Sequence, residues 1–187
     1  MGNKLPNCAI PYSSRDKHLH MVLSTEQVKL VQGSWELLKD DLGRLGLIVF
    51  LRLFETEPQM KTVFPKIVQM NHDNKLETNI DKDMLQRHAV TVMEGLGAAV
   101  ESLDDSRILN SVLISIGQTH VQRQVKPHMV KKLWPSLNYG LKEVLEEYYT
   151  KSVAEAWKTV YDYICVYMKM GMENPDIDLD ITSEIGR

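Results

Sequence analysis

The stretch QRHAVTVMEGLGAAV, Gln86 to Val100, places a histidine on the apolar side of a predicted helix. Val92, Leu96, Ala99 and Val100 recur at the spacing of one helical face, and His88 lies one turn before Val92 on that face. An imidazole buried without a hydrogen-bond partner or a metal costs about 1 to 3 kcal/mol. The rest of the chain must therefore supply a partner for His88.

A second histidine repeats this pattern. The stretch DDSRILNSVLISIGQTH, residues 104–120, predicts a helix with Leu109, Leu113, Ile116 and His120 on one face. Taken alone, each histidine is more often a core residue bonded to a carbonyl than a ligand, but the pair shifts the balance towards ligands. The other four histidines lie in polar segments or at a helix start, where we expect exposure: His18, His20, His72 and His128.

The composition indicates one globular domain, since the chain has 187 residues, of which 43% are hydrophobic and 25% charged. A net charge of −3 gives no basic field for nucleic acid. No apolar run approaches the roughly 18 residues of a membrane-spanning helix. Cys8 and Cys165 lie far apart with no metal-ligand or disulfide spacing, which favours a reducing compartment. We therefore expect a cytoplasmic protein.

Helical periodicity recurs along the chain, and no convincing alternating strand appears, so we predict an all-α fold. Ser24 and Gln27 predict a capping box and Leu23 with Val28 a hydrophobic staple, which starts the first helix near Thr25. The second helix carries an apolar stripe, and Pro58 ends it. That stripe comprises Leu47, Phe50, Leu51 and Phe54.

The remaining pattern predicts a polar, irregular stretch and two long C-terminal helices. The irregular stretch covers residues 66–81. The long helices are expected at 127–148 and 151–170, with Gly171 as a C-terminal cap.

Three segments follow from these elements. Residues 1–23 are predicted to form a flexible tail, 24–171 the folded domain and 172–187 an acidic tail.

Two neutral imidazoles on different helices, with no carboxylate or thiolate at ligand spacing, are poorly suited to a tetrahedral zinc site. They suit the two axial positions of a haem, which brings four nitrogen ligands of its own and needs an apolar slot. The sequence therefore favours a haem pocket between the helices of His88 and His120.

Several stretches resemble globins over residues 22–170. VLSTEQVKLVQGSW resembles their first helix, FLRLFETEPQMKTVF their second and third, and QRHAVTVMEGLGAAV their distal helix. The resemblance implies the globin fold, a three-on-three helical sandwich around haem b. It makes His120 the proximal and His88 the distal histidine, with Phe64 wedged against the haem.

The same resemblance assigns the pocket lining. Val92 matches the apolar residue beside a bound gas, and Phe50 lies where globins place a residue over the distal pocket. We also expect Leu96, Ile116 and Val125 to contact the haem.

Within the family, the chain looks most like the neuroglobin and globin X types, which bind haem through both histidines. This implies electron transfer or gas and redox sensing with an unidentified redox partner, and binding of O2, CO or NO only after His88 leaves the iron. Two alternatives stay open: a reversible oxygen carrier or store, and a haem enzyme such as a nitrite reductase, NO dioxygenase or superoxide producer.

Polar neighbours of the pocket carry further expectations. The His120 Nδ1–H should be held by the Ile116 carbonyl or by the Thr119 hydroxyl. Lys66 is a candidate for a haem propionate contact, and Arg87 or Arg123 could serve similarly. Thr91 stands where many neuroglobin-like proteins carry a lysine, a departure from their pattern.

The N-terminus MGNKLPNCAI offers Gly2 for myristoylation and Cys8 for palmitoylation. This arrangement resembles the N-terminus of globin X proteins. Two acyl chains would hold the protein at the inner face of the plasma membrane. Pro6 replaces the expected Ser or Thr at that position, and a plain disordered tail is the alternative.

Overall fold

The computed structural model describes residues 23–69 and 79–176, and these residues are almost entirely helical. The α-helices are α2 (Thr25–Leu38), α3 (Leu42–Thr56), α4 (Lys82–Glu101), α5 (Ser106–Val121), α6 (Pro127–Lys131), α7 (Trp134–Leu145) and α8 (Lys151–Glu173). Three 3-10 turns join them, η1 (Lys39–Asp41), η2 (Pro58–Val63) and η3 (Glu146–Tyr148). The proposed lipidation sites Gly2 and Cys8 lie outside the described residues.

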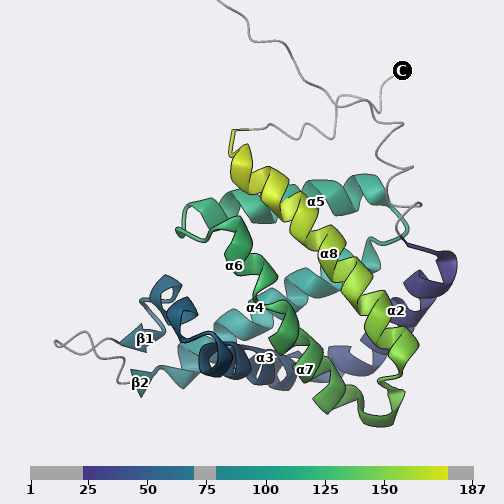
Figure 1. Cartoon of the computed structure of the whole chain (residues 1–187), viewed down its shortest axis with the longest axis horizontal. Helices are drawn as coiled ribbons and strands as arrows, with labels where there is room; N and C mark the ends of the chain where they lie inside the picture. Colours follow the sequence, from purple (N-terminus) through teal and green to yellow (C-terminus); the bar gives the residue numbers. More distant parts are fainter. Residues whose placement is uncertain (1–22, 70–78, 177–187) are drawn as a thin grey trace, which may run out of the picture.

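The helices form a three-on-three sandwich, which confirms the all-α prediction (Figure 1). In the packing, α5 crosses α8, α3 lies against α4 and α7, and α2 contacts α8 and α4. Within the described residues, no helix has the length and apolar character needed to cross a membrane.

Helix α2 begins where the sequence predicts. The Ser24 side chain accepts the Gln27 N–H and the Gln27 side chain accepts the Ser24 N–H, so the capping box is present. Leu23 is buried and Val28 packs against the same core, as expected for the staple. Helix α2 thus starts at Thr25, as the capping box predicts.

Two hydrophobic clusters make up the core. The larger contains residues of α2, α3, α4, α5, α7 and α8, among them Trp35 and Trp157. The smaller lies between α3, η2 and α4 and contains Phe50 and Phe54. Val92 and Leu133 pack against both clusters, so the two clusters meet between α4 and α7.

The segment predicted to be irregular holds a minimal strand pair. Strand β1 (Val68–Gln69) pairs antiparallel with β2 (Asn79–Ile80), with Val68 opposite Ile80. Each strand has two residues, too few to show an alternating sequence pattern.

The prediction of one long helix at 127–148 is wrong, because this segment forms α6, α7 and η3 instead. Pro135 explains the first break: its ring would clash with the carbonyl of Lys131, the residue at which α6 ends. At the second break Glu146 adopts φ 48°, which ends α7.

Two smaller expectations also fail. Gly171 does not cap α8, because the helix continues to Glu173 and ends at the cap residue Asn174. Leu51 belongs to the apolar stripe of α3 by spacing, yet it is 48% exposed on the outer side of the helix.

Candidate haem pocket

Helix α5 carries His120 in its last turn and fixes the ring through its own backbone. The Nδ1 atom of His120 lies 2.8 Å from the carbonyl oxygen of Ile116, one turn earlier. A carbonyl oxygen only accepts, so Nδ1 carries the proton and Nε2 keeps its lone pair. The other expected acceptor, the Thr119 hydroxyl, donates instead to the Ser115 carbonyl. His120 is thereby set to bind a metal through Nε2.

Helix α4 places His88 against aromatic rings. Asp81 caps the helix by accepting the Met84 N–H, and His88 follows two turns later. The imidazole packs edge-on to Phe50 and Phe64, with ring centroids 5.0 and 5.3 Å away. Among the described residues, no hydrogen-bond partner meets the His88 ring.

Burial keeps both histidines from taking up a proton. Burial lowers the pKa of His88, and the charges of Arg123 and His120 lower it further. Burial likewise lowers the pKa of His120, against the opposing effect of the Ile116 hydrogen bond. Both rings are therefore held in the neutral form, which is the form that binds a metal.

Phe64 lies at the corner between η2 and β1, where it packs in an aromatic cluster. Its ring makes edge contacts with Phe50 and Phe54 at centroid distances of 5.8 and 5.2 Å, besides the contact with His88. Phe50 itself is only 3% exposed. These rings give His88 a rigid apolar wall on the α3 side.

The other predicted lining residues lie on the facing helices. Val92 and Leu96 of α4 and Ile116 of α5 are half-buried and pack against the larger cluster. Val125 follows the end of α5, half-buried, and its N–H bonds to the His120 carbonyl at 3.2 Å.

The predicted cations differ in their position. Arg123 is exposed, and its charge lowers the pKa of both histidines. Lys66 and Arg87 are exposed, and neither has such an effect. Thr91 turns its hydroxyl back to the Arg87 carbonyl. Of these three cations, only Arg123 changes the pKa of both histidines.

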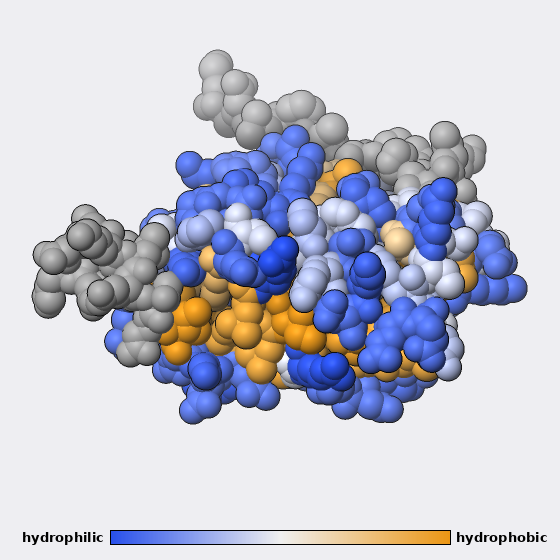
Figure 2. All heavy atoms as spheres, turned by 60° about the horizontal axis from the view of Figure 1, so that its bottom comes forward, coloured by the Kyte–Doolittle hydropathy of each residue, from blue (hydrophilic) through white to orange (hydrophobic). Residues whose placement is uncertain are grey.

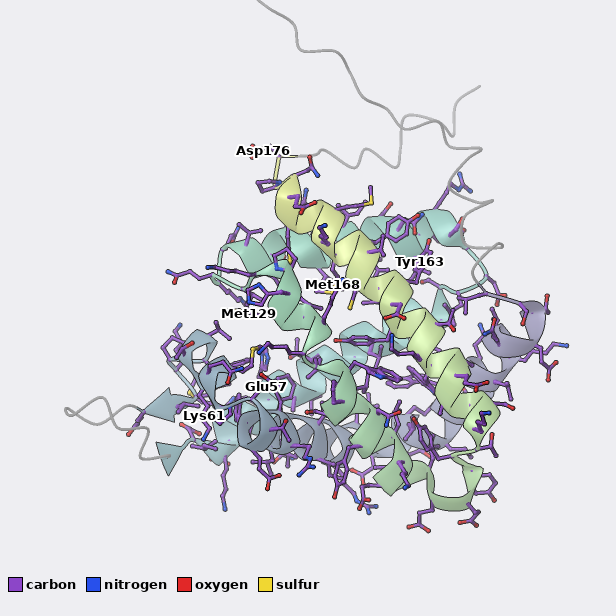
Figure 3. All side chains as sticks on the ribbon, viewed as in Figure 1. Glu57, Lys61, Met129, Tyr163, Met168 and Asp176 are labelled. Atoms are coloured by element: carbon purple, nitrogen blue, oxygen red, sulfur yellow. The ribbon has the colours of Figure 1, made fainter. Side chains whose placement is uncertain are left out.

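Two lining residues were missed by the sequence analysis. Met129 of α6 and Leu133 after it pack against the smaller cluster, beside Phe64 and Val92. Figure 3 shows Met129 above the corner that carries Glu57 and Lys61. Met129 and Leu133 are ordinary apolar residues four positions apart, and that spacing alone does not distinguish a pocket residue from a core residue.

The chemistry of this donor set fits a haem. Among the described residues, no group of three or more His, Cys, Asp or Glu side chains could hold a metal ion by itself. Two neutral imidazoles in an apolar setting suit a metal that arrives with its own equatorial ligands. His120 and His88 would hold the iron, and the lining residues would contact the porphyrin faces.

Known proteins resemble this chain over most of its length. The family model named Globin matches residues 48–168. Neuroglobin from Danio rerio is 32% identical over 149 residues, which cover 80% of this chain and 92% of the relative. Neuroglobin from Tetraodon nigroviridis is 30% identical over the same shares of the two chains. Cytoglobin-1 from Oryzias latipes is 28% identical over 148 residues, 79% of this chain and 82% of the relative.

A solved structure shares the fold. A hexacoordinated haem protein from an anhydrobiotic tardigrade superimposes with a TM-score of 0.70 at 20% identity, over 81% of this chain and 96% of that one. Fold and site define a haem-binding helical sandwich. The chain belongs to the globin family.

Proposed function

We propose that this globin binds haem b between His120 and His88 and works in electron transfer or in sensing of gases and redox state. One observation carries the proposal: His88 on α4 packs against Phe50 and Phe64, His120 on α5 keeps Nε2 unprotonated, and His120 lies close enough to act on the pKa of His88. The neuroglobin relatives and the hexacoordinated tardigrade protein support it by their likeness.

Bound haem supplies an iron that shuttles between two oxidation states and binds diatomic gases. The protein's part is to keep both ligands in place. His120 keeps its proton on Nδ1 through the Ile116 bond, so Nε2 stays available in either oxidation state. His88 is confined by Phe50 and Phe64. Two matched ligands need little rearrangement on electron transfer, which favours a redox role.

The position of His88 also controls gas binding. O2, CO or NO can enter only in the fraction of molecules whose His88 has swung away, and the apparent affinity falls by that fraction. Phe50 has no hydrogen-bond donor, so only His88 among these two can stabilise a polar ligand. Arg123 is our choice for the haem propionates, because its charge reaches both histidines.

The rate of CO binding to the reduced protein tests the role of His88. In the wild type we expect a slow phase whose rate levels off with CO concentration, because His88 must leave first. His88→Leu should remove this phase and leave one fast phase that rises linearly with CO. His128→Leu is the matched control, because His128 is exposed on α6, and it should behave as the wild type.

A wild type that binds CO in one linear phase, like His88→Leu, would refute the bis-histidyl proposal. It would favour a reversible oxygen carrier. Slow autoxidation in air would then be the next property to measure, since a carrier requires it.

A further inference from the structure

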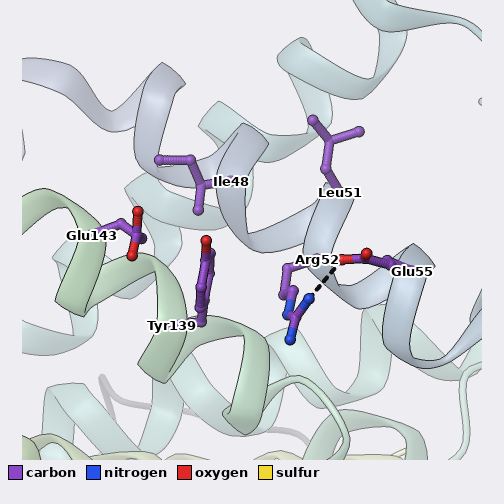
Figure 4. Close-up of a pocket in the computed structure, with 6 residues that line it drawn as sticks. All are labelled: Ile48, Leu51, Arg52, Glu55, Tyr139 and Glu143. Atoms are coloured by element: carbon purple, nitrogen blue, oxygen red, sulfur yellow. Dashed lines mark hydrogen bonds and ion pairs between the residues drawn. The ribbon is translucent and has the colours of Figure 1, made fainter.

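A surface groove between α3 and α7 lies on the outer side of the molecule, away from the histidines. It is lined by Ile48, Leu51, Arg52, Glu55, Tyr139 and Glu143 (Figure 4). The opposite side of α3 carries the buried residues Phe50 and Phe54. The groove is therefore separate from the haem pocket.

The floor and wall of the groove are apolar and exposed. Leu51 is 48% exposed and Tyr139 is 40% exposed, and Ile48 beside them is half-buried. Figure 2 brings the α3 and α7 side forward and shows apolar residues gathered between hydrophilic ones. An exposed apolar patch with a polar rim is typical of an interaction surface.

The charges of the groove lie on opposite sides of this apolar centre. Figure 4 shows Glu143 on one side of Tyr139 and Arg52 on the other. The Arg52 guanidinium lies over the Tyr139 ring, 5.0 Å from its centroid, and donates through Nη1 to Glu55 at 2.7 Å. Arginine has five N–H donors, so Arg52 can also donate to a second carboxylate. Among the described residues, no ion pair engages Glu143.

We propose that this groove is the contact surface of a homodimer. Two copies related by a two-fold axis through the groove would place Leu51 and Tyr139 against the same residues of the second copy. Each Glu143 would then face the Arg52 of the other copy. An isologous interface needs a patch that is complementary to itself. This groove meets that condition, because its apolar centre lies between the unpaired carboxylate of Glu143 and the spare N–H donors of Arg52.

The patch is small, so the dimer is weak. Interfaces of modest area belong to transient complexes, and we expect dissociation constants between micromolar and millimolar. Sedimentation velocity of the haem-loaded full chain, from low micromolar to near-millimolar concentration, should show a reversible shift from monomer to dimer.

Two sets of variants test the surface. Leu51→Glu should abolish the dimer. Ile108→Glu is the matched control, because Ile108 is also 48% exposed but lies on α5, and it should dimerise as the wild type does. Arg52→Glu and Glu143→Arg should each weaken the dimer at least tenfold, and the double variant should recover most of the loss. Circular dichroism and the haem spectrum report that every variant is folded.

Three results would overturn the proposal. A wild type that stays monomeric at all concentrations would leave the groove to a different partner. A dimer that survives Leu51→Glu, or that Ile108→Glu disrupts equally, would place the interface elsewhere. A double charge variant that is weaker than both singles would exclude the Arg52 to Glu143 contact.

Discussion

His120 donates its Nδ1–H to the Ile116 carbonyl, and this bond decides which ring nitrogen can hold iron. Sequence reasoning found His88 and His120 because each interrupts an apolar helical face. The sequence alone allows two acceptors for the Nδ1–H of His120, because the Ile116 carbonyl and the Thr119 hydroxyl both lie within one helical turn of it. The structure shows the carbonyl, since the Thr119 hydroxyl is turned towards Ser115. Pocket residues at helix ends, such as Met129, carry no such signal.

Removal of the His120 side chain tests its role as a ligand. We expect His120→Gly to lose the wild-type haem spectrum, because the remaining pocket wall is apolar and offers only His88. Added imidazole should restore a low-spin spectrum by filling the gap. The test is to titrate the variant with haem, with and without imidazole, and to record the absorption spectrum. A variant that keeps the wild-type spectrum unaided would show that His120 is not a ligand.

Cys165 on α8 should be unreactive in the folded protein. Burial raises the pKa of its thiol from 9.0 to about 11, with a further contribution from the charge of Asp162. Near neutral pH this leaves about a hundredfold less thiolate than an ordinary cysteine has, and the thiolate is the reactive form.

The Cys8→Ser variant isolates this thiol for labelling with a disulfide reagent at about pH 8. The folded protein should react far more slowly than the same chain in urea. Equal rates in the two states would mean that Cys165 is accessible.

At the scale of elements, two glycines set the crossing of α5 and α8. A Cβ at Gly117 would lie 2.1 Å from the Met168 carbonyl oxygen, and one at Gly171 would lie 2.0 Å from that of Ile114. The sequence predicts Gly171 as a helix cap, because a glycine near the end of a helix is more often a cap than a site of close helix contact. A close approach between two helices has no local sequence pattern. By contrast, Pro135 is a local sequence signal for the break before α7.

Gly117→Ala and Gly171→Ala should each destabilise the protein by about 3 kcal/mol, because the clash is with backbone and the helices must separate. Gly117 lies one turn before His120, so its variant should also disturb the haem spectrum.

Gly33→Ala is the matched control in α2. Nothing lies within 4 Å of a Cβ there, and the variant should stabilise the helix by about 1 kcal/mol. Urea unfolding of the three variants makes the comparison. Equal stabilities would show that the α5 and α8 crossing tolerates a side chain.

At the scale of the whole molecule, the pocket lies where the two hydrophobic clusters meet. Val92 and Leu133 contact both clusters. His88 packs against rings that belong to the smaller cluster, and His120 is bonded to Ile116, which packs against the larger one. The all-α class and the histidine pair could be predicted from periodicity, because both repeat along single helices. The contact between the two clusters could not be predicted from periodicity, since it depends on where the chain breaks between α6 and α7 and on how these helices pack.

Haem removal should therefore weaken the whole fold. Ligand binding stabilises the native state by linkage, and a tightly held group contributes at least about 3 kcal/mol. Thermal unfolding of the haem-free chain should show a clearly lower Tm than that of the loaded chain. Equal Tm values would mean that the haem does not contribute to the core.

The most direct test of the account is the visible absorption spectrum of the purified, dithionite-reduced protein without added ligand. Axial ligation controls the spin state of the iron. We predict sharp, resolved α and β bands of low-spin iron held by both His88 and His120. A single broad high-spin band would contradict the account, because it would show that His88 does not bind the iron.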